Sequence, residues 1–178
     1  MIAVALLAAS LSAGCLVLSL HPAYDDQTIA FDEALLGEWR ATEDNVQVIV
    51  ERGEWRSYRI QYKHPVAESV FTAHLTAVEN TYYLDLMPLR GVEHGTGLIP
   101  THIILRLTRD GERWHVAAID YDRARALPGR TARGRVAAAL DERHNVVLTG
   151  ATPAIRSWLR AREERDFSAP ATFERVIR

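Results

Sequence analysis

The sequence predicts a mainly β fold: an antiparallel eight-stranded up-and-down barrel, with one amphipathic C-terminal helix and a short final strand. Short runs rich in β-branched and aromatic residues recur from residue 37 onward, and turn residues separate them. Asp110-Gly111 is a strong hairpin signal between two of these runs. The regular spacing and the short loops are typical of an antiparallel meander, which forms either a sandwich or a closed barrel.

The strands and the helix are expected in a simple order along the chain. The expected strands are 37–40, 46–50, 55–62, 70–78, 82–87, 101–107, 114–119, 146–148 and 173–177. The helix begins at Thr152-Pro153, because Thr can cap a helix and Pro suits its first position. Ile155, Trp158 and Leu159 fall on one face of this helix, which indicates that this face is buried.

The N-terminus is apolar and carries no charge over residues 1–20, which indicates a targeting segment. Ser12-Ala13-Gly14-Cys15 resembles a lipobox, which implies cleavage before Cys15 and a lipid on its thiol. Cys15 is the single cysteine of the chain, so it forms no internal disulfide, and lipidation explains its presence. Two alternatives stay open: an uncleaved anchor, since about 20 apolar residues can span a bilayer, and ordinary signal cleavage.

These features divide the chain into three parts. Residues 1–20 are a signal peptide with a lipobox or a membrane anchor, 21–35 are a tether, and 36–178 are one barrel domain. We expect a monomer in the cell envelope, attached to a membrane through its N-terminus; the outer membrane, on its periplasmic side, is favoured over the inner membrane because no Asp follows Cys15. The net charge of −2 gives no basic field for nucleic acid. The Arg-rich segment 121–143 is expected as a solvated loop or, alternatively, a surface for anionic head groups.

The Gly37-Glu38-Trp39 motif at the first expected strand resembles the Gly-x-Trp signature of lipocalins. That resemblance implies a barrel whose closed end is plugged by Trp39 and whose helix packs outside. It also implies an Arg or Lys stacked over the Trp, for which Arg156 is the candidate. The chain further resembles poorly characterised bacterial lipoproteins with lipocalin-like domains over about residues 31–175. The stretches that carry this resemblance are 71–75, 83–88, 100–102 and 148–152.

No motif in the sequence indicates catalysis or a metal. The side chains considered for either role are Asp85, His94, His102, His115 and Asp120. None of them has a tight ligand spacing, and alternation along its strand suggests that His102 points to solvent. Neither a Gly-x-Ser-x-Gly motif nor a phosphate-binding loop is present. We therefore expect no metal, no cofactor and no enzymatic activity.

The aromatic residues of the expected strands suggest a ligand cavity. The candidates for ligand binding are Tyr58, Tyr62, Phe71 and Tyr83. An eight-stranded barrel is either filled by side chains or holds one small ligand. The leading hypothesis is an envelope lipoprotein that binds a small hydrophobic or amphipathic ligand, for which an open interior of at least about 300 Å³ would be expected. The alternative is a structural or interaction lipoprotein with a filled barrel, whose loops contact an envelope partner.

Overall fold

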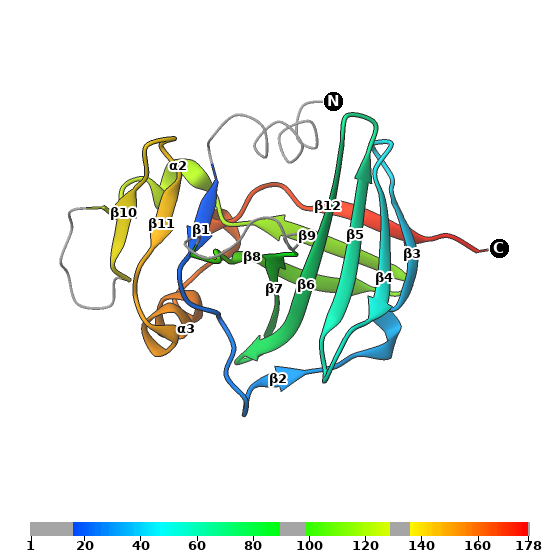
Figure 1. The fold of residues 1–178 in the computed structure, drawn as a ribbon, viewed down its shortest axis with the longest axis horizontal. Coiled ribbons are helices and arrows are strands. Elements are labelled where there is room, and N and C mark those ends of the chain that lie inside the picture. The colour runs from blue at the N-terminus through cyan, green and yellow to red at the C-terminus, as the bar shows by residue number, and fades with distance from the viewer. Residues whose placement is uncertain (1–15, 90–98, 129–135, 178) are drawn as a thin grey trace.

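The computed structural model describes residues 16–89, 99–128 and 136–177, and it confirms the predicted barrel (Figure 1). Eight antiparallel strands form the closed barrel. They are β3 (Gly37–Ala41), β4 (Gln47–Arg52), β5 (Tyr58–His64), β6 (Ala67–Val78), β7 (Thr81–Pro88), β8 (Ile103–Asp110), β9 (Arg113–Ala118) and β12 (Ala171–Arg175). The pairing of β6 with β7 and of β12 with both β9 and β3 closes the sheet on itself.

The eighth barrel strand is the final strand of the chain rather than 146–148. That stretch is β11 (Val146–Leu148), which lies outside the barrel in a three-stranded sheet between β1 (Val17–Ser19) and β10 (Ala138–Leu140). The segment between β9 and β12 also carries α2 (Tyr121–Ala124), α3 (Thr152–Arg160) and the short helix η2 (Glu164–Asp166). Apolar strand patterns do not specify partners, so sequence alone could not separate β11 from the barrel.

Residues 16–35 are part of the folded domain, so the prediction that 21–35 form a tether is wrong. Strand β1 pairs in parallel with β11, and Ser19 bridges to His102 just before β8. Strand β2 (Ile29–Ala30) pairs with β6, and the 3-10 helix η1 (Glu33–Leu35) precedes β3. Ala23, Ile29 and Leu35 are buried, because this segment covers one side and one end of the barrel.

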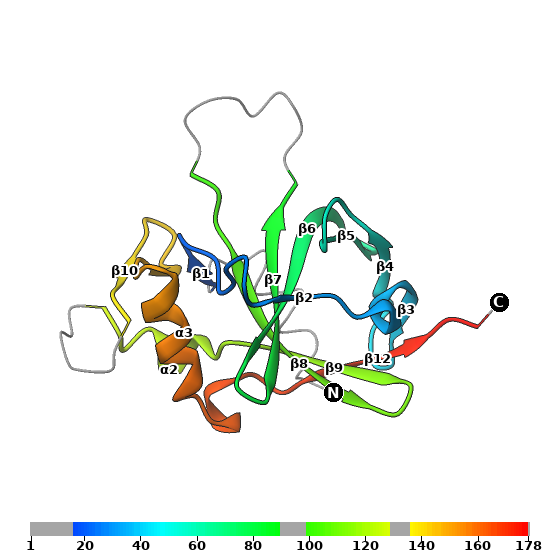
Figure 2. The ribbon, with the colours of Figure 1, turned by 90° about the horizontal axis from the view of Figure 1, so that it is seen from below.

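The barrel has apolar residues on both faces of several strands because a second layer covers part of its outside. Inward residues such as Ile60, Leu84 and Leu105 form the interior core. Ile155 and Trp158 of α3 pack with outward barrel residues in a separate core, and Figure 2 shows α3 beside the barrel. Helix α3 therefore has the buried face that its sequence predicts. Within the described ranges, no helix has the length and apolar character needed to cross a bilayer.

Trp39 lies at one end of the barrel, where η1 closes it, as the Gly-x-Trp motif implies. Its Nε1 donates to the carbonyl of Leu35 at 2.8 Å, and its side chain is buried. The guanidinium of Arg175 lies 4.4 Å from the Trp39 ring centroid, and it donates to the carbonyls of Leu36 at 2.8 Å and Ala34 at 2.7 Å. These bonds satisfy carbonyls of the short helix, so Arg175 fastens η1 to the barrel.

The identification of Arg156 as the cation over Trp39 is therefore wrong. Arg156 lies on α3 and donates instead to the carbonyl of Ala23 at 2.7 Å, Oγ1 of Thr76 at 3.0 Å and the carbonyl of Ala77 at 2.8 Å. It ties the N-terminal segment and the helix to the outside of the barrel.

Gly37 is required by the same closed end. Its φ is 134°, and a Cβ at this position would lie 2.5 Å from Nη1 of Arg175. Any larger residue would meet both backbone strain and the stacked guanidinium, which gives the glycine of the motif a local physical reason.

Replacing Arg175 with Ala should lower the free energy of unfolding by about 2–4 kcal/mol, because it removes the cation–π contact and leaves two carbonyls without their donor. Urea denaturation would measure the loss. Arg52→Ala is a matched control: its guanidinium also lies 4.4 Å from a ring centroid, that of Phe31, but its side chain is 57% exposed. Equal losses in the two variants would contradict the role assigned to Arg175.

Candidate ligand site in the barrel

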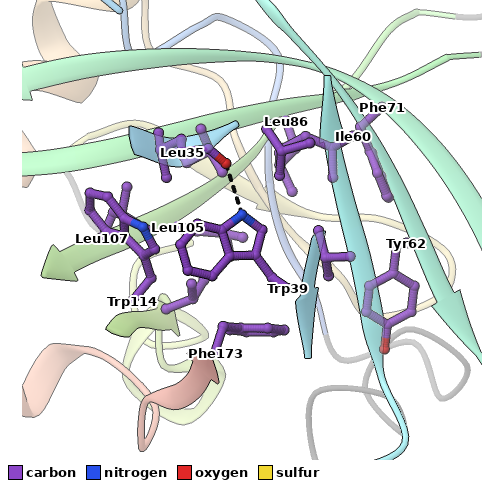
Figure 3. A pocket seen from close by; sticks show the side chains of 14 residues that line it. Leu35, Trp39, Ile60, Tyr62, Phe71, Leu86, Leu105, Leu107, Trp114 and Phe173 are labelled. Atoms are coloured by element: carbon purple, nitrogen blue, oxygen red, sulfur yellow. Dashed lines mark hydrogen bonds between the residues drawn. The ribbon is translucent and has the colours of Figure 1, made fainter. Parts of the chain in front are cut away.

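The interior of the barrel holds a cavity of about 110 Å³. Its lining is made only of apolar and aromatic side chains from all eight strands and η1. The lining residues are Leu35, Trp39, Val48, Val50, Ile60, Tyr62, Phe71, Leu84, Leu86, Leu105, Leu107, Trp114, Val116 and Phe173. The strands bring them together because alternate residues of each strand point inward. Figure 3 shows Trp39 among them, with its hydrogen bond to Leu35.

Two of the four predicted ligand residues, Tyr62 and Phe71, line this cavity, and Tyr58 and Tyr83 do not. The prediction did not include the aliphatic residues of β7 and β8, which also line the cavity. The inward alternation of these aliphatic residues was a usable signal, but the prediction rested on aromatic residues alone.

The cavity is about one third of the 300 Å³ at which ordinary ligand pockets begin. A dry apolar cavity of about 150 Å³ can hold a benzene molecule, so this interior of about 110 Å³ accommodates a group smaller than benzene. The end of a single hydrocarbon chain is small enough.

Tyr62 is the polar member of the lining. Figure 3 shows its ring along one side, with the hydroxyl turned away from Trp39. That hydroxyl is buried and has no hydrogen-bond partner among the described residues. Burial, and secondarily the charge of Asp44, raises the pKa of Tyr62, so the hydroxyl stays neutral. The ring contributes apolar surface to the cavity, and its oxygen lies on the side of the β3–β4 turn.

A larger hollow of about 530 Å³ lies at the open end of the barrel. The start of β6, the end of β7, the start of β8 and strand β1 line it. These elements contribute, in the same order, Ser69, Pro88, Ile103 and Leu18. Phe71 lines both this hollow and the interior cavity. The Phe71 ring therefore stands between the mouth of the barrel and its interior.

Tyr58 has a structural role at the opposite end. It is fully buried, its ring stacks on Phe31 with centroids 4.7 Å apart, and its hydroxyl accepts from the Asp32 amide at 2.7 Å. Tyr83 points outward instead, where it packs with Phe167 and α3 in the second core. Neither ring lines the cavity, because one ring holds η1 in place and the other lies on the outer face of the barrel.

The alkaline stability of the protein should depend on Tyr58. Burial raises its pKa from 10.0 to about 12. Between these values the unfolded chain loses the proton that the folded protein retains, so stability falls as the pH rises. Across this pH range the free energy of unfolding falls by about 2–3 kcal/mol. Tyr58→Phe should lose about 1 kcal/mol at neutral pH but decline less in alkali. Unfolding of both proteins from about pH 9 to 12 would test this, and parallel declines would refute it.

Asp85 and His102 form a buried pair on the outside of the barrel. The Nδ1 of His102 lies 2.6 Å from Oδ1 of Asp85, and the other Asp85 oxygen accepts from the amide of Ala23 at 2.7 Å. Tyr24 stacks on His74 beside them, with centroids 4.2 Å apart. The expectation that His102 points to solvent is wrong: it does lie on the outer face, but residues 19–24 cover that face.

This pair holds the N-terminal segment against the barrel. The other candidates lie apart from it: His115 contacts Thr172, and Asp120 caps α2 through the amide of Arg123. Within the part of the chain that the structure describes, no three His, Cys, Asp or Glu side chains gather to hold a metal ion. His94 and Cys15 lie outside the described residues, as does part of the Arg-rich segment, residues 129–135.

The barrel, the Trp39 plug and the external helix α3 are together compatible with a lipocalin-like fold. Comparison with protein-family models, curated proteins and solved structures gave no match to this chain.

Proposed function

We propose that this protein is a membrane-attached lipoprotein of the lipocalin-like type that binds one slender hydrocarbon chain through the open end of its barrel. The observation that carries this proposal is the wholly apolar interior cavity, next to a mouth hollow that shares Phe71 with it. A chain entering past Phe71 would place its tip in the interior and its remaining length in the hollow.

The sizes of the two spaces favour a chain over a compact ligand. Each methylene transferred from water to an apolar site contributes about 0.8 kcal/mol. The few carbons that fit into 110 Å³ thus give only modest affinity. The hollow of about 530 Å³ has room for the rest of the chain and for a polar head.

The fold of the N-terminal segment bears on how the protein is attached. Leu16–Leu20 were included in the apolar targeting segment, but Val17–Ser19 form β1. Because Val17–Ser19 form a strand, they are not part of a spanning helix. Cleavage before Cys15 would leave β1 in the mature protein, which favours a lipid on Cys15 over an uncleaved span. The envelope location and the preference for the outer membrane belong to the same proposal.

A second candidate function is an interaction lipoprotein with a filled barrel, whose loops contact an envelope partner. The cavity volume of about 110 Å³ favours this reading, because most ligand sites are larger. The two functions differ in whether the interior is ever occupied.

Val48→Phe should reduce the amount of bound lipid severalfold, because Val48 lines the cavity and a phenyl group would fill it. Native mass spectrometry of the protein extracted from its own membrane, with analysis of the extracted lipids, would measure this. The matched control is Ile49→Phe on the outer face of β4. Absence of co-purified lipid from the wild-type protein and both variants would reject ligand binding and support the filled barrel.

A further inference from the structure

Three exposed apolar side chains lie on connections at the open end of the barrel. Val66, in the turn between β5 and β6, is 85% exposed, and Leu89 and Ile99, on the two sides of residues 90–98, are 49% and 68% exposed. Figure 2 shows the chain on both sides of residues 90–98 leaving the barrel together. Exposed apolar residues are ordinary one by one, and Trp55 and Tyr82 are exposed at the opposite end. The three at the open end matter because the chain enters the described domain there. We call these three residues the apolar rim.

The chain enters the described domain at the same end. Leu16 lines the mouth hollow together with Leu89 of the rim. Its amide donates to Oδ1 of Asn145 at 3.0 Å, and β1 begins at the next residue. Cys15 is thus one residue from a fixed point of the fold. Because one residue spans at most about 3.6 Å, a lipid on Cys15 would bring the bilayer surface to the open end and leave no flexible tether between them.

We propose that the open end of the barrel rests on the lipid bilayer, with the apolar rim in the membrane interface. This inference rests on the proposed attachment through Cys15. The N-terminal attachment and the rim lie at one end, so both engage the same surface without strain. Glu68 and Arg143 also line the hollow, and they would lie at the level of the lipid head groups, where Arg143 meets phosphate. A hydrocarbon chain could then pass between the bilayer and the barrel without crossing water.

Single labels can test this orientation, because acylation would consume the one natural thiol. Val66→Cys, Ile99→Cys and Trp55→Cys, each in the full chain, would carry an environment-sensitive fluorophore. Trp55 is the matched control, since it is also apolar and 66% exposed, but it lies in the β4–β5 turn at the opposite end. The acylated proteins would be placed in vesicles of phosphatidylethanolamine and phosphatidylglycerol that contain lipids with a nitroxide on the acyl chain.

The labels at positions 66 and 99 should be quenched severalfold more than the label at position 55. Equal quenching at all three positions, in protein that floats with the vesicles, would overturn the orientation but leave the attachment intact. If the fluorophore labels the wild-type chain and the protein does not float with the vesicles, Cys15 carries no lipid. That result would overturn both the attachment and the orientation. A rim covered by a protein partner would also leave positions 66 and 99 unquenched in these vesicles, and would reject the proposal.

Discussion

Closure of the sheet by β12 is the constraint on which the rest of the structure depends. Strand β12 pairs with β9 on one side and with β3 on the other, so the last strand of the chain joins the first barrel strand to the seventh. It also supplies Phe173 to the cavity and Arg175 to the closed end. The interior cavity, the position of Trp39 and the anchoring of η1 all follow from this one strand.

Alternation of apolar and polar residues in the sequence predicted much of the fold. The features that it did not predict have physical causes. The barrel strands from β3 to β9, the helix α3 and the Trp39 plug could be predicted because each has a local pattern. The cation over Trp39 was assigned wrongly, although Ala171, Phe173 and Arg175 alternate along one face of β12. That alternation was a usable signal.

The errors at Tyr83, His102 and residues 21–35 share a different cause. All three lie in or under the outer layer of the barrel. Prediction from alternating apolar and polar residues assumes that the outer face of each barrel strand meets water. In this barrel, α3 and residues 19–24 cover part of the outer face. Residues 16–20 had been set aside with the targeting segment, and no sequence pattern indicated that β1 pairs with a strand about 130 residues later. Cavity volume depends on side-chain packing and could not be predicted either.

The pairing of β1 with β11 has a consequence for the order in which the chain can fold. Val17 lies at the start of the described residues and Val146 lies about 130 residues later, yet the two are register partners. The barrel likewise cannot close without β12, the last strand of the chain. Contacts between such distant residues are slow to form. Both sheets can therefore be completed only after almost all of the domain has been synthesised.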